Sequence, residues 1–264
     1  MVPGFQRARD LGRPLRVGHT TGVPQQEAKP RLPRKPKPSQ PRKAATKPRA
    51  VSATPRALLG PLLKAHPDWG PTLDFTTPFE LLIATILAAQ ARDERINQVT
   101  ATLFKKYKGP AAFVKAPQAQ LEKDLRATGF YRQKAMAVKA TSRGLLEEFG
   151  GEVPADMDSL VRLMGVGRKT ASMVLANAFG VPAIAVDRHV QRVALRLGLT
   201  RHPDPDDIEA DLRAYFPKKD WVKANWLLVL HGRRTCTPAP RCPECPVLAL
   251  CPYPTKAKVR PPAP

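Results

Sequence analysis

Four cysteines near the C-terminal end are the residues whose type and spacing most directly indicate a chemistry. They lie within the last thirty residues, at Cys236, Cys242, Cys245 and Cys251, and the chain has no others. Thiolates bind soft metals and iron–sulfur clusters, so this clustering indicates an inorganic centre. The spacing C-x5-C-x2-C-x5-C contains one close pair, whereas zinc sites more often contain two. The pattern favours a [4Fe–4S] cluster over zinc. Two disulfides are the weakest alternative, because no secretory signal is seen.

A second candidate site lies in the segment 163–171, where two glycines flank a valine. Its central residues are Gly165, Val166, Gly167, Arg168, Lys169 and Thr170. The glycines allow a tight turn with positive φ and let a phosphate approach the backbone closely. The helix predicted to follow would point its free N–H groups at that phosphate. We interpret the segment as a helix-hairpin-helix that grips the DNA backbone. The alternative is an ordinary turn between two helices.

Lys169 stands in the first turn of that predicted helix, where the helix dipole disfavours a cation. This placement, burial and the neighbouring Arg168 would each lower the pKa of the lysine, and a neutral amine is a nucleophile. The alternative is a plain contact with a DNA phosphate, which is the usual role of lysine in a basic protein. Lys169 is therefore a candidate catalytic residue.

Asp187 ends an apolar stretch and begins another predicted helix. A carboxylate at that position caps free N–H groups, which needs no further function. A second interpretation, compatible with the first, is an ionised carboxylate that deprotonates a nucleophile or stabilises a developing cation. His189, two residues later, is interpreted as structural.

Helices must position these residues, because the apolar pattern from Ser52 onward is helical and few segments alternate between apolar and polar residues. Thr77, Pro78 and Glu80 mark one helix start, and the segment 81–89 that follows is apolar on nearly every face, as in the centre of a bundle. Further helices are predicted at about 94–107, 110–116, 118–127, 131–149, 156–163, 168–179, 188–197, 205–215 and 219–231. Glycines at 150, 151, 180 and 232 are predicted to end helices. The predicted fold class is all-α.

The net charge of +22 over 264 residues indicates a polyanionic partner, most simply nucleic acid, and ribosomal association would explain it equally well. Residues 1–51 are predicted to form a disordered, basic, Pro-rich arm, since the first fifty carry thirteen Lys and Arg, nine Pro and two acidic residues. The arm is interpreted as a tether that scans DNA or as a solubilising tail, with an organellar transit peptide as the weaker alternative. No apolar run reaches membrane-spanning length, so no membrane partner is expected.

Taken together, these motifs resemble the endonuclease III family of helix-hairpin-helix DNA glycosylases. The resemblance covers about residues 55–253. Its ordered blocks are Thr77 to Ala84, Gly129 to Tyr131 followed by Lys134 and Ala135, Gly151 to Pro154, Gly165 to Ala171, Ile184 to Val190 and Leu230 to Arg233.

The resemblance implies a two-domain, all-α fold with the DNA groove between the domains. One would be a six-helix domain at 71–181, with the helix-hairpin-helix at about 156–180. The other would be an iron–sulfur cluster domain formed by 52–70 and 182–255. A tail at 256–264 would follow.

The resemblance also implies a reaction. A damaged nucleotide would be flipped out of the duplex into a pocket. Lys169 would attack the sugar C1′, expel the base and leave a Schiff base, and β-elimination would then cut the strand 3′ to the abasic site. Asp187 would help to deprotonate Lys169 and offset positive charge on the sugar. The cluster would fold the tail and take no part in the chemistry.

By the same resemblance, several further residues would contact DNA. Gln90 would fill the gap left by the flipped nucleotide, Phe130 would enter the opposite strand, and Asp93 would lie near the lesion pocket. Arg92 stands where the family commonly has a small hydroxyl residue, so this cation would narrow base access or add a phosphate contact. Arg241 would contact DNA from a cysteine loop one residue shorter than is usual. Without the resemblance, Gln90 would be a helix-end amide facing water and Phe130 a packing residue.

Substrates and partners follow from the same comparison of families. Adenine-specific mismatch glycosylases lack a lysine at this place and 8-oxoguanine glycosylases lack the cysteines, so oxidised or saturated pyrimidines are the expected substrates. The expected partner is double-stranded DNA containing such bases or abasic sites, bound by a monomer in a bacterial cytoplasm or nucleoid. Two other functions stay open: a non-catalytic binder of damaged DNA, and a zinc-ribbon-like nucleic-acid module.

Overall fold

The fold is built from helices. The computed structural model describes residues 53–253, and within them it contains α-helices, short 3-10 helices and no strand. The all-α class predicted from the sequence is confirmed. The predicted arm at 1–51 and the predicted tail at 256–264 lie outside the described residues.

The helices begin and end close to the predicted positions. The α-helices are α1 (Pro55–Ala65), α2 (Pro78–Leu87), α3 (Asp93–Lys106), α4 (Gly109–Lys115), α5 (Gln118–Leu125), α6 (Tyr131–Phe149), α7 (Met157–Arg162), α8 (Arg168–Ala178), α9 (Arg188–Leu197), α10 (Pro205–Tyr215) and α11 (Trp221–Arg234). The 3-10 helices are η1 (Arg126–Thr128), η2 (Lys218–Asp220), η3 (Cys242–Glu244) and η4 (Leu248–Leu250). Aspartates cap α7, α9 and α10 at their N-termini, and left-handed glycines end α6 and α9, which explains the agreement.

One hydrophobic core, here called the first core, is built around α2 from residues between 73 and 183. Two capping hydrogen bonds fix the start of α2: Thr77 Oγ1 accepts the Glu80 N–H at 3.2 Å, and the Glu80 carboxylate accepts the Thr76 N–H at 2.7 Å. Most of α2 is buried, and the helix packs against α3, α6 and α8. This packing brings α8, which carries Lys169, beside the helix that leads to Gln90.

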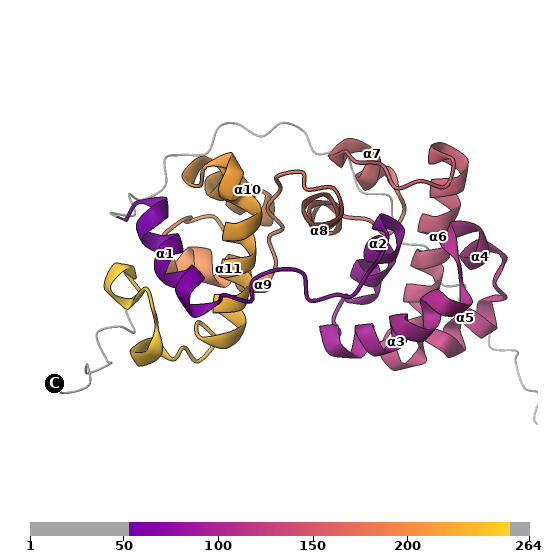
Figure 1. The fold of residues 1–264 in the computed structure, drawn as a ribbon, viewed down its shortest axis with the longest axis horizontal. Helices are drawn as coiled ribbons and strands as arrows, with labels where there is room; N and C mark the ends of the chain where they lie inside the picture. The colour runs from indigo at the N-terminus through magenta and orange to yellow at the C-terminus, as the bar shows by residue number, and fades with distance from the viewer. Residues whose placement is uncertain (1–52, 254–264) are drawn as a thin grey trace, which may run out of the picture. The chain divides into compact units, whose positions relative to one another are not determined.

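A second hydrophobic core, here called the second core, combines α1 with residues between 184 and 247. Figure 1 shows α1 among α9, α10 and α11, away from α2, which follows it in the chain. The Tyr215 hydroxyl of α10 donates to the Ala53 carbonyl at 2.7 Å, which ties the start of the described chain to this core. All described residues belong to one compact unit, so the domain boundaries inferred from the sequence stay a prediction.

Gly232 was predicted to end a helix, and this prediction was wrong. Helix α11 continues through Gly232 to Arg234. A Cβ at position 232 would lie 2.9 Å from the His189 Cβ and 3.1 Å from Val193 Cγ2. The glycine is therefore required by the close approach of α11 to α9 and does not act as a helix stop.

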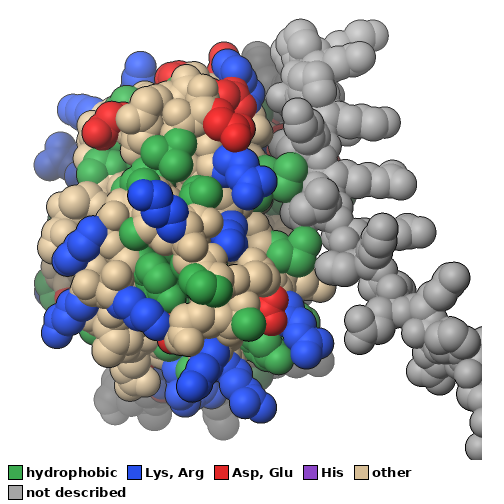
Figure 2. Space-filling model, turned by 90° about the vertical axis from the view of Figure 1, so that its right-hand side faces the viewer, with side chains coloured by type: hydrophobic (Ala, Val, Ile, Leu, Met, Phe, Trp, Pro, Cys, Tyr) green, Lys and Arg blue, Asp and Glu red, His purple; other side chains and the backbone are tan. Residues whose placement is uncertain are grey.

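On one face of the molecule the positive charge is dispersed. Figure 2 shows the face on the right-hand side of Figure 1, where Lys and Arg side chains are spread between small apolar areas and the acidic side chains are few. Such a surface favours polyanionic partners over a broad area. None of the described helices has the length and apolar character that crossing a bilayer requires.

Candidate functional site

A cleft of about 830 Å³ brings residues of both cores together. Its walls come from the turn after α2, the first half of α8, the segment before α9, and α11. Of the predicted site residues, those that line it are Gln90, Arg92, Asp93, Lys169, Thr170 and Asp187. The two candidate catalytic residues, from different helices, therefore share one concave surface.

The glycine hairpin joins α7 to α8 in the predicted way. Gly165 has a φ of +89°, and a Cβ there would lie 3.2 Å from the Ala137 Cβ on α6. The Thr141 hydroxyl of α6 donates to the Met164 carbonyl at 2.6 Å and holds the turn against that helix. Gly167 caps α8 without a side chain, so no side-chain oxygen accepts the first N–H groups of the helix. The N-terminus of α8 is thus available to an anion.

Val166 lies at the centre of the hairpin and faces the protein. Its side chain is 2% exposed and belongs to the first core, and its N–H donates to the Leu163 carbonyl at 3.1 Å. The flanking glycines are exposed. The hairpin therefore offers the backbone of Gly165 and Gly167 to a ligand, while Val166 anchors the turn.

Lys169 is the second residue of α8, is exposed, and lines the cleft. Within the described residues, its amine makes no recorded hydrogen bond or ion pair. A surface lysine with no acidic partner, placed at the positive end of a helix dipole, is free to react with a ligand in the cleft.

Asp187 caps α9 through only one of its two carboxylate oxygens. Both recorded hydrogen bonds, from the N–H groups of His189 and Val190 at 2.8 Å each, go to Oδ1. Oδ2 has no recorded partner among residues 53–253. The capping role and a chemical role are compatible, because they use different oxygens.

Two positions have strained backbone. Among the described residues, Gln90 (φ +55°) and Phe130 (φ +48°) are the non-glycine residues with positive φ. Such conformations cost energy and concentrate at functional sites. Phe130 is 60% exposed at the start of α6 and lies outside the cleft lining, while Gln90 is exposed at its wall. These are the two residues for which the family resemblance implies insertion into DNA.

Lys134 supports the turn that carries Phe130. Its side chain is buried, its amine donates to the Thr128 carbonyl at 2.7 Å, and burial lowers its pKa. Thr128 is the last residue of η1, two residues before Phe130. Sequence analysis had used Lys134 only as part of a family motif.

Asp93 forms a bridge across the cleft wall. Its Oδ2 accepts the Thr72 hydroxyl at 2.6 Å and Arg233 Nη1, from α11, at 2.8 Å. Arg92, next to it, is exposed, lines the same wall, and makes no recorded side-chain hydrogen bond with another described residue. The predicted cation at the pocket mouth is thus present and available.

Arg168 and Arg241, which are both predicted to bind DNA, form hydrogen bonds with groups of the protein. Arg168 points to α10, where its guanidinium forms two hydrogen bonds to Glu209. Arg241 donates to the Arg234 carbonyl and pairs with Glu244 at 3.5 Å. Neither side chain lines the cleft.

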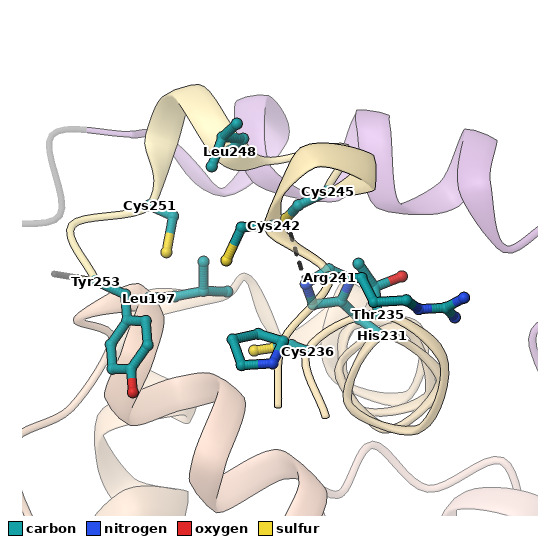
Figure 3. Close-up of a pocket in the computed structure, with 11 residues that line it drawn as sticks. Leu197, His231, Thr235, Cys236, Arg241, Cys242, Cys245, Leu248, Cys251 and Tyr253 are labelled. Atoms are coloured by element: carbon teal, nitrogen blue, oxygen red, sulfur yellow. Dashed lines mark hydrogen bonds between the residues drawn. The ribbon is translucent and has the colours of Figure 1, made fainter. Parts of the chain in front are cut away.

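The four cysteines converge beside the second core. None of the four forms a disulfide, and together with His231 and Leu197 they line one pocket (Figure 3). Short 3-10 turns at η3 and η4 lead into Cys245 and Cys251 and bring the loop back over α9 and α11. Burial raises the pKa of the Cys245 thiol to about 11, so a thiolate there needs a cationic partner such as iron.

The donor set suits a metal centre that is bound through sulfur. Within residues 53–253, no three His, Cys, Asp or Glu side chains are arranged to hold one metal ion. A zinc site requires four ligands about one atom, whereas a [4Fe–4S] cluster is larger and takes one thiolate for each iron. The four thiols around one shared pocket are compatible with the cluster.

Two arginines of α9 hold the cysteine loop, and sequence analysis missed them. Arg192 donates to the carbonyls of Cys236 at 2.8 Å and Gly232 at 2.7 Å. Arg196 donates to Cys236 Sγ at 3.4 Å and to the Thr237 carbonyl at 2.6 Å. Their spacing of four residues indicates one helix face. It does not indicate that this face meets the loop.

Comparison with known proteins places the fold and the site in a class. Residues 83–218 match the HhH-GPD superfamily base excision DNA repair protein family. Endonuclease III of Bacillus subtilis is 48% identical over 178 residues, which cover 67% of this chain and 81% of that relative. Endonuclease III of Escherichia coli K12 is 39% identical over 203 residues, covering 76% of this chain and 96% of that relative.

Solved structures agree. The structure of a trapped endonuclease III–DNA covalent intermediate, in an estranged-adenine complex, superimposes with a TM-score of 0.74 at 43% identity. The match covers 77% of this chain and 97% of that one. The chain belongs to the endonuclease III family. It is a DNA glycosylase and abasic-site lyase of base excision repair.

Proposed function

We propose that this enzyme removes oxidised or saturated pyrimidines from double-stranded DNA through a Schiff base on Lys169, and then cuts the strand by β-elimination. The observation that carries the proposal is the shared cleft, which is lined both by an amine and by a carboxylate oxygen that have no hydrogen-bond partner among residues 53–253. The similarity to a trapped covalent endonuclease III–DNA intermediate supports a covalent step.

The residues divide the reaction between them. Asp187 Oδ2 takes a proton from the Lys169 ammonium, and the neutral amine attacks C1′ while the bond from C1′ to the base breaks. The base leaves with the electron pair of that bond and takes up a proton from water. Opening of the sugar ring gives the iminium. A proton is then lost from C2′, because the iminium accepts the electron pair of the C2′–H bond. The bond from C3′ to the phosphate oxygen breaks next, and the 3′ phosphate leaves with that bond's electron pair.

The hairpin and the strained residues support binding of a bent, opened duplex. The backbone of Gly165 and Gly167 and the N-terminus of α8 suit a phosphate. Gln90, at the cleft wall, is placed to occupy the space that an extruded nucleotide leaves, and Phe130 to enter between bases. The enzyme would act as a monomer.

Cys236, Cys242, Cys245 and Cys251 would hold a [4Fe–4S] cluster. When bound, such a cluster supplies structural cross-linking and, in principle, one-electron chemistry. Neither base removal nor β-elimination transfers electrons, so the residues of this chain carry out both steps. Arg192 and Arg196 would keep the first cysteine in place.

Borohydride reduction tests the proposal. Incubation with a duplex that contains thymine glycol or an abasic site should give a covalent protein–DNA complex, seen as a shifted band on a denaturing gel. Lys169→Ala should form none while it still binds the duplex. Binding of damaged DNA without any trapped complex in the wild-type enzyme would replace this function with the non-catalytic alternative that Arg92 at the cleft mouth favours.

A further inference from the structure

Arg168 is the first residue of α8 and the immediate neighbour of Lys169, but its side chain bonds to α10 and does not line the cleft. Its Nε donates to Glu209 Oε2 at 2.6 Å and its Nη2 to Glu209 Oε1 at 2.9 Å. Both bonds run in parallel, which is the strongest arrangement available to a guanidinium and a carboxylate. Glu209 is only 6% exposed, so this carboxylate depends on its partners.

The ion pair connects two parts of the fold. Arg168 starts a helix whose buried face lies in the first core, and Glu209 lies on α10, which packs in the second core. Near the other end of α8, Asn177 Oδ1 accepts the Trp226 indole N–H of α11 at 2.9 Å. Helix α8 is therefore attached to second-core helices near both its ends, and Lys169 lies between the two attachments.

Consecutive side chains on an α-helix point about 100° apart. Arg168 does not line the cleft, whereas Lys169 and Thr170 do. The orientation of the first turn of α8 is thus coupled to the direction of the lysine: with Arg168 held on α10, Lys169 lines the cleft that Asp187 also lines. A phosphate contact by Arg168 would require it to give up a two-point bond to a buried carboxylate.

We propose that Arg168 and Glu209 are positioning residues that orient the first turn of α8, so that Lys169 faces Asp187 across the cleft. This proposal rests on the function assigned to Lys169 above. Arg168 then has a different role from the DNA contact expected of a basic hairpin residue. Glu209, which lies far along the chain, helps to position Lys169.

Glu209→Gln and Arg168→Lys test the proposal, since each keeps the approximate shape and removes the paired two-point bond. Both should lower the single-turnover rate of base removal from a thymine-glycol duplex by about 10-fold or more, because small displacements of a reacting group are costly. Affinity for the same duplex should change less than twofold, and KM should follow affinity while kcat falls. The exchange Arg168→Glu with Glu209→Arg should recover most of the lost rate.

Arg213→Lys is the matched control. Arg213 also pairs with Glu209, at 3.4 Å, but it lies on α10 itself and does not reach α8. The rate of this variant should stay within about twofold of the wild type, because the ion pair lies within one helix and does not hold α8.

The opposite pattern would overturn the proposal. If Arg168 acts as a phosphate contact, Arg168→Lys weakens binding to DNA, and removal of the Arg168–phosphate contact lowers the salt dependence of affinity by about one ion. Glu209→Gln then binds DNA as tightly as the wild type or tighter, and it removes the base at the wild-type rate. If Glu209→Gln fails to fold, Arg168→Lys and the exchange decide alone. If the positioning proposal fails, the wild-type enzyme is still trapped by borohydride and Lys169→Ala is still not trapped. Failure of this proposal can therefore be told apart from failure of the proposed function.

Discussion

Gln90 and Phe130 share a left-handed backbone, at φ +55° and +48°, that no other non-glycine residue within 53–253 adopts. They lie in separate turns, after α2 and before α6. Each conformation costs about 1–3 kcal/mol, and the fold retains both. Since Gln90 stands at the cleft wall and Phe130 is largely exposed, we propose that both conformations serve contact with DNA.

Phe130→Ala should weaken binding to lesion duplexes with little effect on stability. An aromatic side chain that stacks on a base contributes about 1–3 kcal/mol, so affinity should fall by roughly tenfold or more, as measured by fluorescence anisotropy. Leu146→Ala, which removes another exposed apolar side chain of α6, is the control and should bind normally. Equal binding by the two variants would show that Phe130 is only a surface residue.

Asp187→Asn should fold and bind damaged DNA but lose most of its activity. Asparagine caps helices about as well as aspartate, so the Oδ1 bonds to His189 and Val190 have a substitute. The amide cannot accept a proton from Lys169, and the single-turnover rate should fall by about 100-fold or more. A wild-type rate in this variant would reduce Asp187 to a helix cap.

The cysteine loop should contain iron. We expect the purified protein to be coloured and to contain iron and inorganic sulfide, with little zinc, by elemental analysis. Cys245→Ala should fail mainly in folding, with loss of soluble protein and a lower Tm, because this loop packs on the second core. A colourless, folded protein with stoichiometric zinc would contradict the cluster assignment.

Lys134 should make stability depend on pH in a defined direction. Burial lowers its pKa in the folded protein below the ordinary 10.5. Between those two values the unfolded chain binds more protons than the folded one, so the free energy of unfolding should rise with pH in that window. Urea titrations should show this rise in the wild type and less of it in Lys134→Met. Parallel pH profiles would show that the buried ammonium does not titrate in this way.

The sequence predicted the helices well because their ends are marked locally. The caps at Thr77 and Asp187 and the glycines at 150, 151 and 180 act on neighbouring backbone, so their effect can be derived without tertiary structure. Gly232 was misjudged because its role depends on a contact with α9 that only the folded chain contains.

The site shows the same division between local and tertiary information. Sequence motifs identified Lys169, Asp187 and the four cysteines as candidates. In the fold, Lys169 and Asp187 line one cleft, and the cysteines line a separate pocket. The partner of Arg168 lies 41 positions away on α10, and Arg192 and Arg196 reach a loop about 40 positions ahead. No pattern within a single helix could have indicated these partners.

The most direct test of the central claim is to identify the atom that bonds to DNA. The enzyme is reduced with borohydride on an abasic-site duplex, digested with protease and nuclease, and the adduct is located by tandem mass spectrometry. We predict a deoxyribose-derived mass on Lys169. An adduct on another lysine or on the terminal amine, with Lys169 unmodified, would contradict the account.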